Sequence, residues 1–479
     1  MTKEKKKLTL SGLAIERMAG QGKCIAHYQG QVVFVEGVAP GDIADVRIIR
    51  NKKKYLIGVA DHILEPSDKR VDPVCQHFGI CGGCKWQHIN YKTQLDFKRQ
   101  EVIDQLERVA KVKLPEIAPI IAAPQTEYYR NKLEFTFSNR RWLSSQEIQS
   151  GQPLQRQALG FHKPRMFDKI VDIKHCYLQP EPSNEIRLAL KTFALEHELG
   201  FYDPVKKAGL LRNLIIRTTS IGQVMVIVQF GESAPQEVES VMQFLKDAFS
   251  QITSLHYVIN TKGNDSYSDL EVVPYYGALQ IEEQMPALDD LNRKLRFMIG
   301  PKSFYQTNTT QAYQLYRVVA DLAGLTGKEI VYDLYTGTGT IALFLAEKAN
   351  KVVGLEYISE AIDDAHNNAN LNKINNVSFK SGDIKDLLHT SIFDEFGKPD
   401  LIVTDPPRTG MHPKVVNRLL EIAVPRIIYV SCNPSTQARD IQMLDARYQV
   451  SAVQPVDMFP HTYHVENVVL LELKNGLEE

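Results

Sequence analysis

Residues 329–342, EIVYDLYTGTGTIA, decide the fold that the sequence predicts. An apolar strand ends at a glycine loop, and the residues after the loop favour a helix. The same alternation continues through KVVGLEY (351–357), NVSFKSGD (376–383), DLIVTDPP (400–407) and RIIYVSCNP (426–434). Regular β-α alternation is typical of a doubly wound parallel sheet, which binds its ligands at the carboxyl ends of the strands. We therefore expect an α/β domain over residues 301–479.

Acidic residues stand at the ends of three successive predicted strands: Asp333, Glu356 and Asp383. The loop from Gly337 to Ala342 fits G-x-G-x-x-A, so a dinucleotide site is the competing interpretation. S-adenosylmethionine (SAM) has no phosphate, and its amino group and sulfonium favour nearby carboxylates. Glu356 lies 19 residues after Gly337, where a carboxylate suits ribose hydroxyls, and Asp383 suits the adenine amino group. We predict a SAM site, although each acid alone could be a helix N-cap.

The fourth strand ends at Asp405-Pro-Pro-Arg408. The two prolines stiffen the loop and present the acidic side chain and the backbone carbonyls to a planar base. Similar loops occur in enzymes that methylate the exocyclic amino groups of bases, which is an alternative function. Those enzymes need no cysteine, because an exocyclic nitrogen is already a nucleophile.

The stretch RIIYVSCNPSTQARD (426–440) places Cys432 at the end of the next strand. Pro434 cannot continue a central strand, and Ser435 or Thr436 can cap a new helix, whose N-terminus favours a thiolate. Uracil C5 becomes nucleophilic when a thiolate adds to C6, after which a base must remove the C5 proton. We interpret Cys432 as the nucleophile and Glu466 as the base, with His464 as the rival base.

Cysteines gather in a second region, Cys75-x5-Cys81-x2-Cys84, to which Cys176 can add a fourth thiolate. Four thiolates fit either zinc or an iron–sulfur cluster. The paired C-x2-C spacing of zinc ribbons is absent, so we favour [4Fe-4S] over zinc. Six cysteines in a long chain without a secretory signal point to metal binding or catalysis, and disulfides are not expected.

The N-terminal part differs in charge from the rest of the chain. Residues 1–60 hold 11 Lys and Arg against 5 Asp and Glu, including Lys5–Lys7 and Lys52–Lys54, whereas the 479-residue chain has a net charge of −1. Short strands at 31–38, 44–50 and 55–64 predict a small barrel that binds nucleic acid. A solvated basic tail is the alternative. Residues 91–111 predict an amphipathic helix with a stripe of Leu95, Val102, Ile103, Leu106 and Val109.

The chain resembles the SAM-dependent RNA uracil-C5 methyltransferases, in particular the iron–sulfur branch that makes 5-methyluridine in 23S ribosomal RNA. The resemblance covers nearly the whole chain and rests on the TRAM-like barrel, the cysteine cluster, Tyr129-Arg-Asn-Lys132, Phe304-x-Gln306-x-Asn308, the glycine loop, Asp405-Pro-Pro-Arg408, Ser431-Cys-Asn-Pro434 and His464-Val-Glu466.

The resemblance implies specific roles. Cys432 is the nucleophile and Glu466 the base; the SAM site is lined by Gln306, Tyr335, Glu356 and Asp405; and a [4Fe-4S] cluster is held by Cys75, Cys81, Cys84 and Cys176. The family also implies that segment 91–124 packs on the catalytic domain. The target uridine must be flipped out or single-stranded to reach Cys432.

The predicted architecture has three parts: an OB-like TRAM barrel (1–64), a central α+β iron–sulfur domain (65–300) and a Rossmann-like methyltransferase domain (301–479). Within the central part we expect residues 139–157 to form a hairpin tip or surface loop. Composition is that of a soluble protein, with no run of about 20 apolar residues, so we expect a cytoplasmic monomer. Transfer RNA is the alternative substrate, and an RNA-binding protein with a vestigial enzyme domain is the alternative function.

Overall fold

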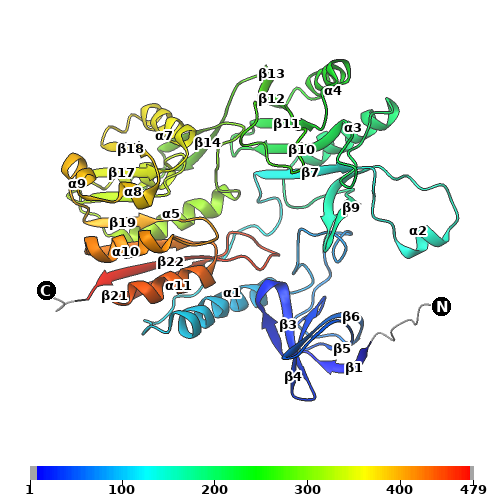
Figure 1. The fold of residues 1–479 in the computed structure, drawn as a ribbon, viewed down its shortest axis with the longest axis horizontal. Helices are drawn as coiled ribbons and strands as arrows, with labels where there is room; N and C mark the ends of the chain where they lie inside the picture. Colours follow the sequence, from blue (N-terminus) through cyan, green and yellow to red (C-terminus); the bar gives the residue numbers. More distant parts are fainter. Residues whose placement is uncertain (1–7, 475–479) are drawn as a thin grey trace.

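The computed structural model describes residues 8–474, so Lys5–Lys7 lie outside the described residues. Three large sheets and one hairpin organise this part of the chain, and Figure 1 shows the N-terminal sheet on one side of helix α1 and the C-terminal sheet on the other. Among the described residues no helix is both long enough and apolar enough to cross a membrane.

The C-terminal sheet confirms the predicted doubly wound fold. Its strands are β16 (Ile330–Leu334), β17 (Lys351–Glu356), β18 (Val377–Ser381), β19 (Leu401–Thr404), β20 (Arg426–Ser431), β21 (Tyr448–Val456) and β22 (Glu466–Leu473). They are ordered β18-β17-β16-β19-β20-β22-β21. The first five are parallel, and β22 runs antiparallel to both β20 and β21. The carboxyl ends of the parallel strands therefore meet at one edge.

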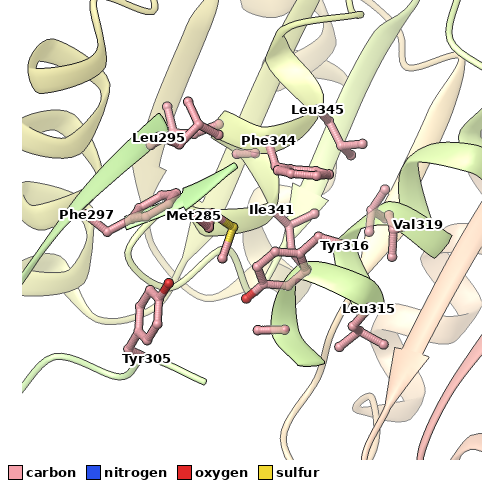
Figure 2. Packing of buried hydrophobic residues seen from close by; sticks show 14 of the residues in the cluster. Met285, Leu295, Phe297, Tyr305, Leu315, Tyr316, Val319, Ile341, Phe344 and Leu345 are labelled. Atoms are coloured by element: carbon pink, nitrogen blue, oxygen red, sulfur yellow. The ribbon is translucent and has the colours of Figure 1, made fainter. Parts of the chain in front are cut away.

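Alternate residues of these strands pack against two helical layers. One layer contains α5 (Thr309–Ala323), α6 (Thr340–Ala346), α7 (Ser359–Asn372) and the hairpin β14 (Ile281–Pro286) with β15 (Lys294–Ile299). Figure 2 shows Phe297 of the hairpin in the same core as Tyr316 of α5 and Phe344 of α6. The predicted boundary at residue 300 assigns this hairpin to the central part, and its core includes residues of the central sheet, such as Ile215 and Met225, as well as those of α5 and α6.

The other layer contains α8 (Ile384–Leu387), α9 (Thr390–Phe396), α10 (Pro413–Ile422), α11 (Pro434–Leu444), α1 (Tyr91–Gln105) and its continuation η2 (Leu106–Ala110). Helix α1 begins at Tyr91 because the Asn90 side chain accepts the Thr93 N–H at 2.9 Å. Its buried residues are Gln94, Lys98 and Val102, so two polar residues occupy the face for which the apolar stripe predicted Leu95. Segment 91–121 thus lies against the C-terminal sheet, and Ile121 pairs with Val456.

The N-terminal sheet has six strands: β1 (Thr9–Ala14), β2 (Arg17–Ala19), β3 (Lys23–Tyr28), β4 (Gln31–Glu36), β5 (Ile43–Lys52) and β6 (Tyr55–Glu65), with the one-turn η1 (Gly20–Gly22) between β2 and β3. Their order is β1-β5-β6-β4-β3-β2, and Figure 1 shows the sheet as a curved unit of its own. Lys53 and Lys54 form the β5–β6 turn, and Lys52 is the last residue of β5. Cys24 is buried, and its thiol donates a hydrogen bond to the Val38 carbonyl at 3.4 Å. This contact supports a structural role for Cys24.

The central sheet has seven strands: β7 (Lys132–Ser138), β8 (Ala158–Lys163), β9 (Met166–Asp172), β10 (Leu211–Thr218), β11 (Val224–Phe230), β12 (Ile252–Ile259) and β13 (Val273–Gly277). Helices α3 (Ser183–Glu196) and α4 (Pro235–Ala248) pack in its core. Residues 139–157 connect β7 to β8 as expected, but they include a short helix, α2 (Ser145–Gln149). Ser144 and Glu147 close it with a capping box, a signal present in the sequence.

Candidate active site

Cys432 and Glu466 meet because two strands of the C-terminal sheet are paired in a fixed register. Ser431, the last residue of β20, pairs with Asn467 of the antiparallel strand β22. One residue further along each strand, Cys432 comes opposite Glu466. Cys432 is half-buried, whereas Glu466 is only 4% exposed. The sequence predicted that both residues lie at one edge of the sheet, and the strand register brings them next to each other.

The Asp405-Pro-Pro-Arg408 loop packs against the turn that carries Cys432. The Arg408 carbonyl accepts hydrogen bonds from Asn433 Nδ2 at 2.9 Å and Thr436 Oγ1 at 3.2 Å. Asn433, and neither Ser435 nor Thr436, is the N-cap of α11: its side chain accepts the Ser435 N–H at 3.2 Å. The two loops therefore hold one another, with Asp405 and Arg408 beside the thiol.

The electrostatic surroundings of Cys432 differ from the expectation of a stabilised thiolate. Burial, followed by the neighbouring carboxylates of Glu466 and Asp405, raises the pKa of Cys432 to about 11, against the opposing charge of Arg408. Burial, followed by Asp405, raises the pKa of Glu466 to about 8. Burial and the two acids therefore oppose the thiolate that the N-terminus of α11 was expected to favour.

Buried acids accumulate at the same edge. Burial raises the pKa of Asp405 to about 7 and also that of Asp333 to about 7. Asp333 accepts the Thr336 hydroxyl at 2.6 Å through one oxygen, while its other oxygen, Oδ1, has no partner among the described residues. Carboxyl groups that crowd together in this way are stabilised as anions by a cation. The edge is therefore suited to a positively charged ligand.

The glycine loop connects these acids to Glu356. Tyr335 and Gly337 have φ of 63° and 55°, a left-handed conformation that is costly for tyrosine and free for glycine. The Glu356 carboxylate accepts the Gly337 N–H at 3.1 Å and the Tyr357 and Ile358 N–H groups at 2.8 and 3.0 Å. These bonds fix the loop against the end of β17.

Asp383 and Tyr335 line a second pocket of about 490 Å³ at the same edge. Asp383 is also the N-cap of α8, accepting the Lys385 N–H at 3.2 Å, and the Lys385 ammonium holds the pKa of that carboxyl below its usual value. Gln306 lies on the segment that leads into α5, where its carbonyl accepts Asn131 Nδ2 at 2.9 Å. No described contact joins the Gln306 side chain to the other predicted SAM residues.

Cys432 opens onto a groove of about 610 Å³ between three parts of the molecule. Phe34, Tyr55 and Lys23 line it from the N-terminal sheet, and Phe97 and Glu101 line it from α1. On the C-terminal side the lining residues are Arg408, Cys432, Asn433, Pro434, Ser435, Tyr463, His464 and Val465. The thiol is therefore reachable along a path that passes aromatic side chains of the N-terminal sheet.

The four other predicted site cysteines line a different cavity, of about 380 Å³. Burial raises the pKa of Cys81 and of Cys84 to about 12, and it raises the pKa of Cys75 and Cys176 as well. Within residues 8–474 no three Cys, His, Asp or Glu side chains converge closely enough to hold one metal ion. The four cysteines nevertheless line one cavity.

Two functional features were absent from the sequence-based prediction. Arg408, which follows the Asp-Pro-Pro triplet, is the cation that lowers the pKa of Cys432. The buried pair of Lys98 and Asp457 lies under the loop that leads into Glu466, with Nζ and Oδ1 2.6 Å apart. Lys98 lies one turn before Val102, on the apolar face of the predicted helix. This position could have indicated from the sequence that Lys98 is buried and has an acidic partner.

The parallel sheet, the glycine loop and the acids at its strand ends define the class of this protein as a SAM-dependent methyltransferase. Residues 278–474 match the family model described as tRNA (Uracil-5-)-methyltransferase, and residues 13–60 match the TRAM domain. The chain belongs to this family of RNA uracil-C5 methyltransferases, as its sequence relatives also indicate.

Two relatives cover nearly the whole chain. An uncharacterized RNA methyltransferase of Bacteroides thetaiotaomicron is 51% identical over 461 residues, 95% of this chain and 100% of the relative. Another, of Porphyromonas gingivalis, is 49% identical over 467 residues, covering 96% and 99%. The solved structure of the Pyrococcus abyssi tRNA (uracil-54, C5)-methyltransferase with S-adenosyl-L-homocysteine is similar at 29% identity and a TM-score of 0.71, covering 96% of this chain and 100% of that one.

Proposed function

We propose that the protein methylates C5 of a specific uridine in RNA through a covalent bond between Cys432 and uracil C6. The observation that carries this proposal is the β20–β22 pairing, which ends at Ser431–Asn467 and so brings Cys432, a residue that lines the groove, next to the buried Glu466. An amino-directed methyltransferase would need only the Asp405 loop. A thiol and a buried acid placed together suit C5 chemistry.

The first half of the reaction is nucleophilic addition. The Cys432 thiol first loses its proton to solvent. The thiolate then adds to C6, the C5=C6 π electrons move to C5 and the C4 carbonyl, and C5 attacks the methyl carbon while the bond from that carbon to the sulfonium sulfur breaks. SAM supplies the methyl group and brings one positive charge, its sulfonium, to the acidic edge. Arg408 stands next to the thiol and favours its anion, opposing the burial that raises its pKa.

The second half is elimination. Glu466 takes the C5 proton, the C5–H electrons re-form the C5=C6 bond, and the C6–sulfur bond breaks to release the Cys432 thiolate. A base works best when its pKa is near the working pH. The pKa of Glu466 is raised to about 8, whereas burial lowers that of His464 to about 4, which supports Glu466 as the base.

The SAM-binding residues we propose are Gln306, Tyr335, Gly337, Glu356, Asp383 and Asp405. The support for a cationic ligand here is the unpartnered Asp333 Oδ1 together with the raised pKa of Asp405. Glu356 already fixes the glycine loop through backbone N–H groups, so it has a role before any ligand binds.

We further propose that Cys75, Cys81, Cys84 and Cys176 hold a [4Fe-4S] cluster of structural or RNA-facing role. The support is that all four cysteines line one cavity. Four thiolates fit either zinc or an iron–sulfur cluster, and the lack of paired C-x2-C spacing favours the cluster. A bound cluster would also explain why four cysteines with raised pKa values line one cavity. Zinc in a colourless protein is the outcome that would overturn this assignment.

RNA would enter along the groove between the N-terminal sheet and Cys432. A TRAM domain matches residues 13–60, and Phe34 and Tyr55 offer faces on which bases can stack. We propose ribosomal RNA as the substrate, with transfer RNA as the alternative because the similar Pyrococcus abyssi enzyme acts on it. The division into parts 1–64, 65–300 and 301–479 stays a prediction, as does the monomeric state.

The proposed chemistry is tested with RNA that contains 5-fluorouridine, which cannot lose a proton from C5. Incubation with SAM should give a covalent protein–RNA complex that survives denaturing electrophoresis, and Cys432→Ala should give none. An active Cys432→Ala enzyme would instead indicate an amino-directed methyltransferase. RNA binding without measurable SAM affinity would indicate a vestigial enzyme domain.

The substrate is identified by mapping 5-methyluridine in cells with and without the gene. One position in 23S ribosomal RNA should lose its methyl group. A loss confined to transfer RNA would replace the ribosomal assignment and leave the chemistry intact.

A further inference from the structure

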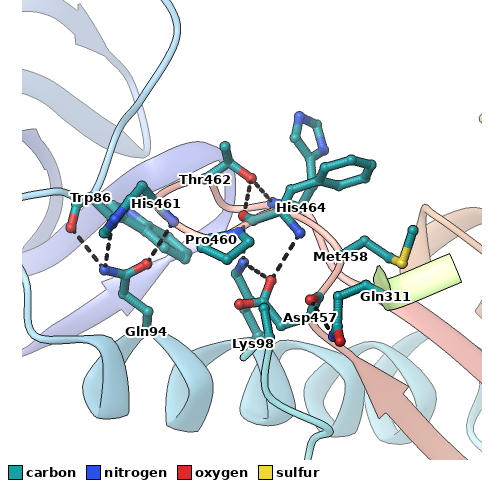
Figure 3. Close-up of polar contacts among 12 residues, drawn as sticks. Trp86, Gln94, Lys98, Gln311, Asp457, Met458, Pro460, His461, Thr462 and His464 are labelled. Carbon is teal, nitrogen blue, oxygen red and sulfur yellow. Dashed lines mark hydrogen bonds and ion pairs between the residues drawn. The ribbon is translucent and has the colours of Figure 1, made fainter. Parts of the chain in front are cut away.

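The loop 457–465 leads from β21 directly into Glu466, and its backbone is held from outside at five consecutive carbonyl groups. These bonds, part of which Figure 3 shows, are Gln311 Nε2 to Asp457 O (2.8 Å), Asn308 Nδ2 to Met458 O (3.0 Å), Lys98 Nζ to Phe459 O (3.0 Å), Tyr129 OH to Pro460 O (3.0 Å), and the Lys85 and Trp86 N–H groups to His461 O (2.8 and 3.0 Å). The donors come from the start of α5, from α1, from Tyr129 and from the residues after Cys84, so the path of the loop is fixed one residue after another.

A buried ion pair lies at the start of this loop. Lys98 and Asp457 have fully buried side chains, with Nζ and Oδ1 2.6 Å apart. Asp457 also accepts the Tyr91 hydroxyl at 2.7 Å and the Phe459 N–H at 3.1 Å. An apolar pair of similar volume is often as stable as a buried ion pair, but only the charged pair fixes one geometry through directed hydrogen bonds.

The backbone at His461 is also constrained. Its φ is 64°, a left-handed conformation that is uncommon for a residue other than glycine. Its N–H donates to Gln94 Oε1 at 2.9 Å, and its carbonyl is the one bound by Lys85 and Trp86. Such a conformation persists when the surroundings determine it. Here the surroundings are α1 and the residues directly after Cys84.

The groups that hold the loop come largely from outside the regions that matched family models. Tyr91, Gln94, Lys98 and Tyr129 lie between residues 60 and 278, whereas the models match 13–60 and 278–474. Cys432 has separate anchors, because its turn is held by the Arg408 carbonyl. A displaced 457–465 loop would therefore move Glu466 more than it moves Cys432.

We propose that Lys98 is a positioning residue for Glu466, acting through Asp457 and the 457–465 loop so that α1 controls the elimination step. The inference rests on the proposed function. The step at issue is the transfer of the C5 proton to Glu466, with re-formation of C5=C6 and cleavage of the C6–sulfur bond. If the base is misplaced, the earlier addition and methyl transfer still occur, and the methylated adduct waits.

The test uses the full-length protein with Lys98→Met and Tyr91→Phe. With 5-fluorouridine RNA and SAM, both variants should form the Cys432 adduct at a rate close to the wild-type rate. With unmodified RNA, turnover of Lys98→Met should fall by roughly 10²-fold, since a misplacement of about 1 Å has that effect, and a methylated covalent complex should accumulate. Tyr91→Phe removes one hydroxyl and should show the same signature to a smaller extent.

Arg140→Met is the matched control, because it breaks another ion pair with a buried aspartate, Arg140–Asp203 at 2.9 Å, in the central part of the chain. It should accumulate no adduct. Equal loss of adduct formation and turnover in Lys98→Met would show a general effect on folding and overturn the proposal. If Lys98→Met does not fold, Tyr91→Phe decides: turnover without adduct accumulation would also overturn it. A wild-type protein that forms no adduct would refute the proposed function itself.

Discussion

Cys432 and the group of Cys75, Cys81, Cys84 and Cys176 lie in different parts of the chain, and the side chains around each determine its chemistry. Cys432 has two carboxyl groups and one guanidinium beside it and faces a groove. Cys81 and Cys84 have other cysteine thiols beside them, and all of these thiols line a separate cavity. Burial raises the pKa of all of them. A thiol beside acids can take part in proton transfer, whereas a thiol beside thiols can bind metal.

The largest effects should come from replacing one cysteine of each group with serine. Cys432→Ser should lower methyl transfer by roughly 10⁴-fold or more, because a serine alkoxide is not formed at this site, and it should leave iron content unchanged. Cys176→Ser should lose iron and about 2–4 kcal/mol of unfolding free energy, because bound metal stabilises the fold. Iron analysis, visible absorption and denaturant unfolding distinguish the two. Iron loss in Cys432→Ser would erase the distinction between the groups.

Glu466→Gln should produce the next largest effect. Turnover should fall by about 10²–10⁴-fold, the usual contribution of a general base. The methylated RNA adduct should remain attached to Cys432 on a denaturing gel with unmodified RNA. His464→Ala serves as the control and should turn over without such accumulation. The reverse pattern would assign the base to His464.

The pH dependence of adduct formation should report the contact between the thiol and the acid. Below pH of about 8 Glu466 is protonated and has no charge to exert on Cys432; above it the carboxylate raises the pKa of the thiol. The rate with 5-fluorouridine RNA should therefore rise with pH towards 11 in the wild type. Glu466→Gln should follow the same curve below pH 8 and be a few-fold faster above it. Stopped-time gel assays between pH 6.5 and 10 would measure both curves. Identical curves for the two proteins would show that the charge of Glu466 does not affect the pKa of Cys432.

The smallest effect concerns access. Tyr55→Ala should weaken RNA binding by about 1–3 kcal/mol, the contribution of one stacked base, and leave the iron spectrum unchanged. Tyr276→Ala is the control, since Tyr276 is 47% exposed on β13, away from the groove. Fluorescence anisotropy with labelled RNA gives both affinities. Equal affinities for the two variants would move the RNA path away from the N-terminal sheet.

The sequence predicted what depends on local patterns. Apolar runs with acidic or cysteine ends predicted the strands and the edge at which Asp333, Asp405 and Cys432 meet. Glu466 could be placed there because it begins the last strand. The face that α1 buries was not predictable from its apolar residues, since Gln94 and Lys98 are satisfied by partners more than 350 positions away. The pKa of Cys432 was unpredictable for the same reason: burial and two distant carboxyl groups set it.

The position of β22 between β20 and β21 has a consequence for the protein during its synthesis. The ribosome makes β20 and β21 before β22, so these two strands lack their common partner until residues 466–473 have emerged. The same eight residues include Glu466, the proposed base, and close the sheet. A nascent or prematurely terminated chain therefore lacks a finished fold whenever it lacks Glu466. Protein synthesis thus offers no stable stage at which a folded enzyme could capture RNA without being able to release it.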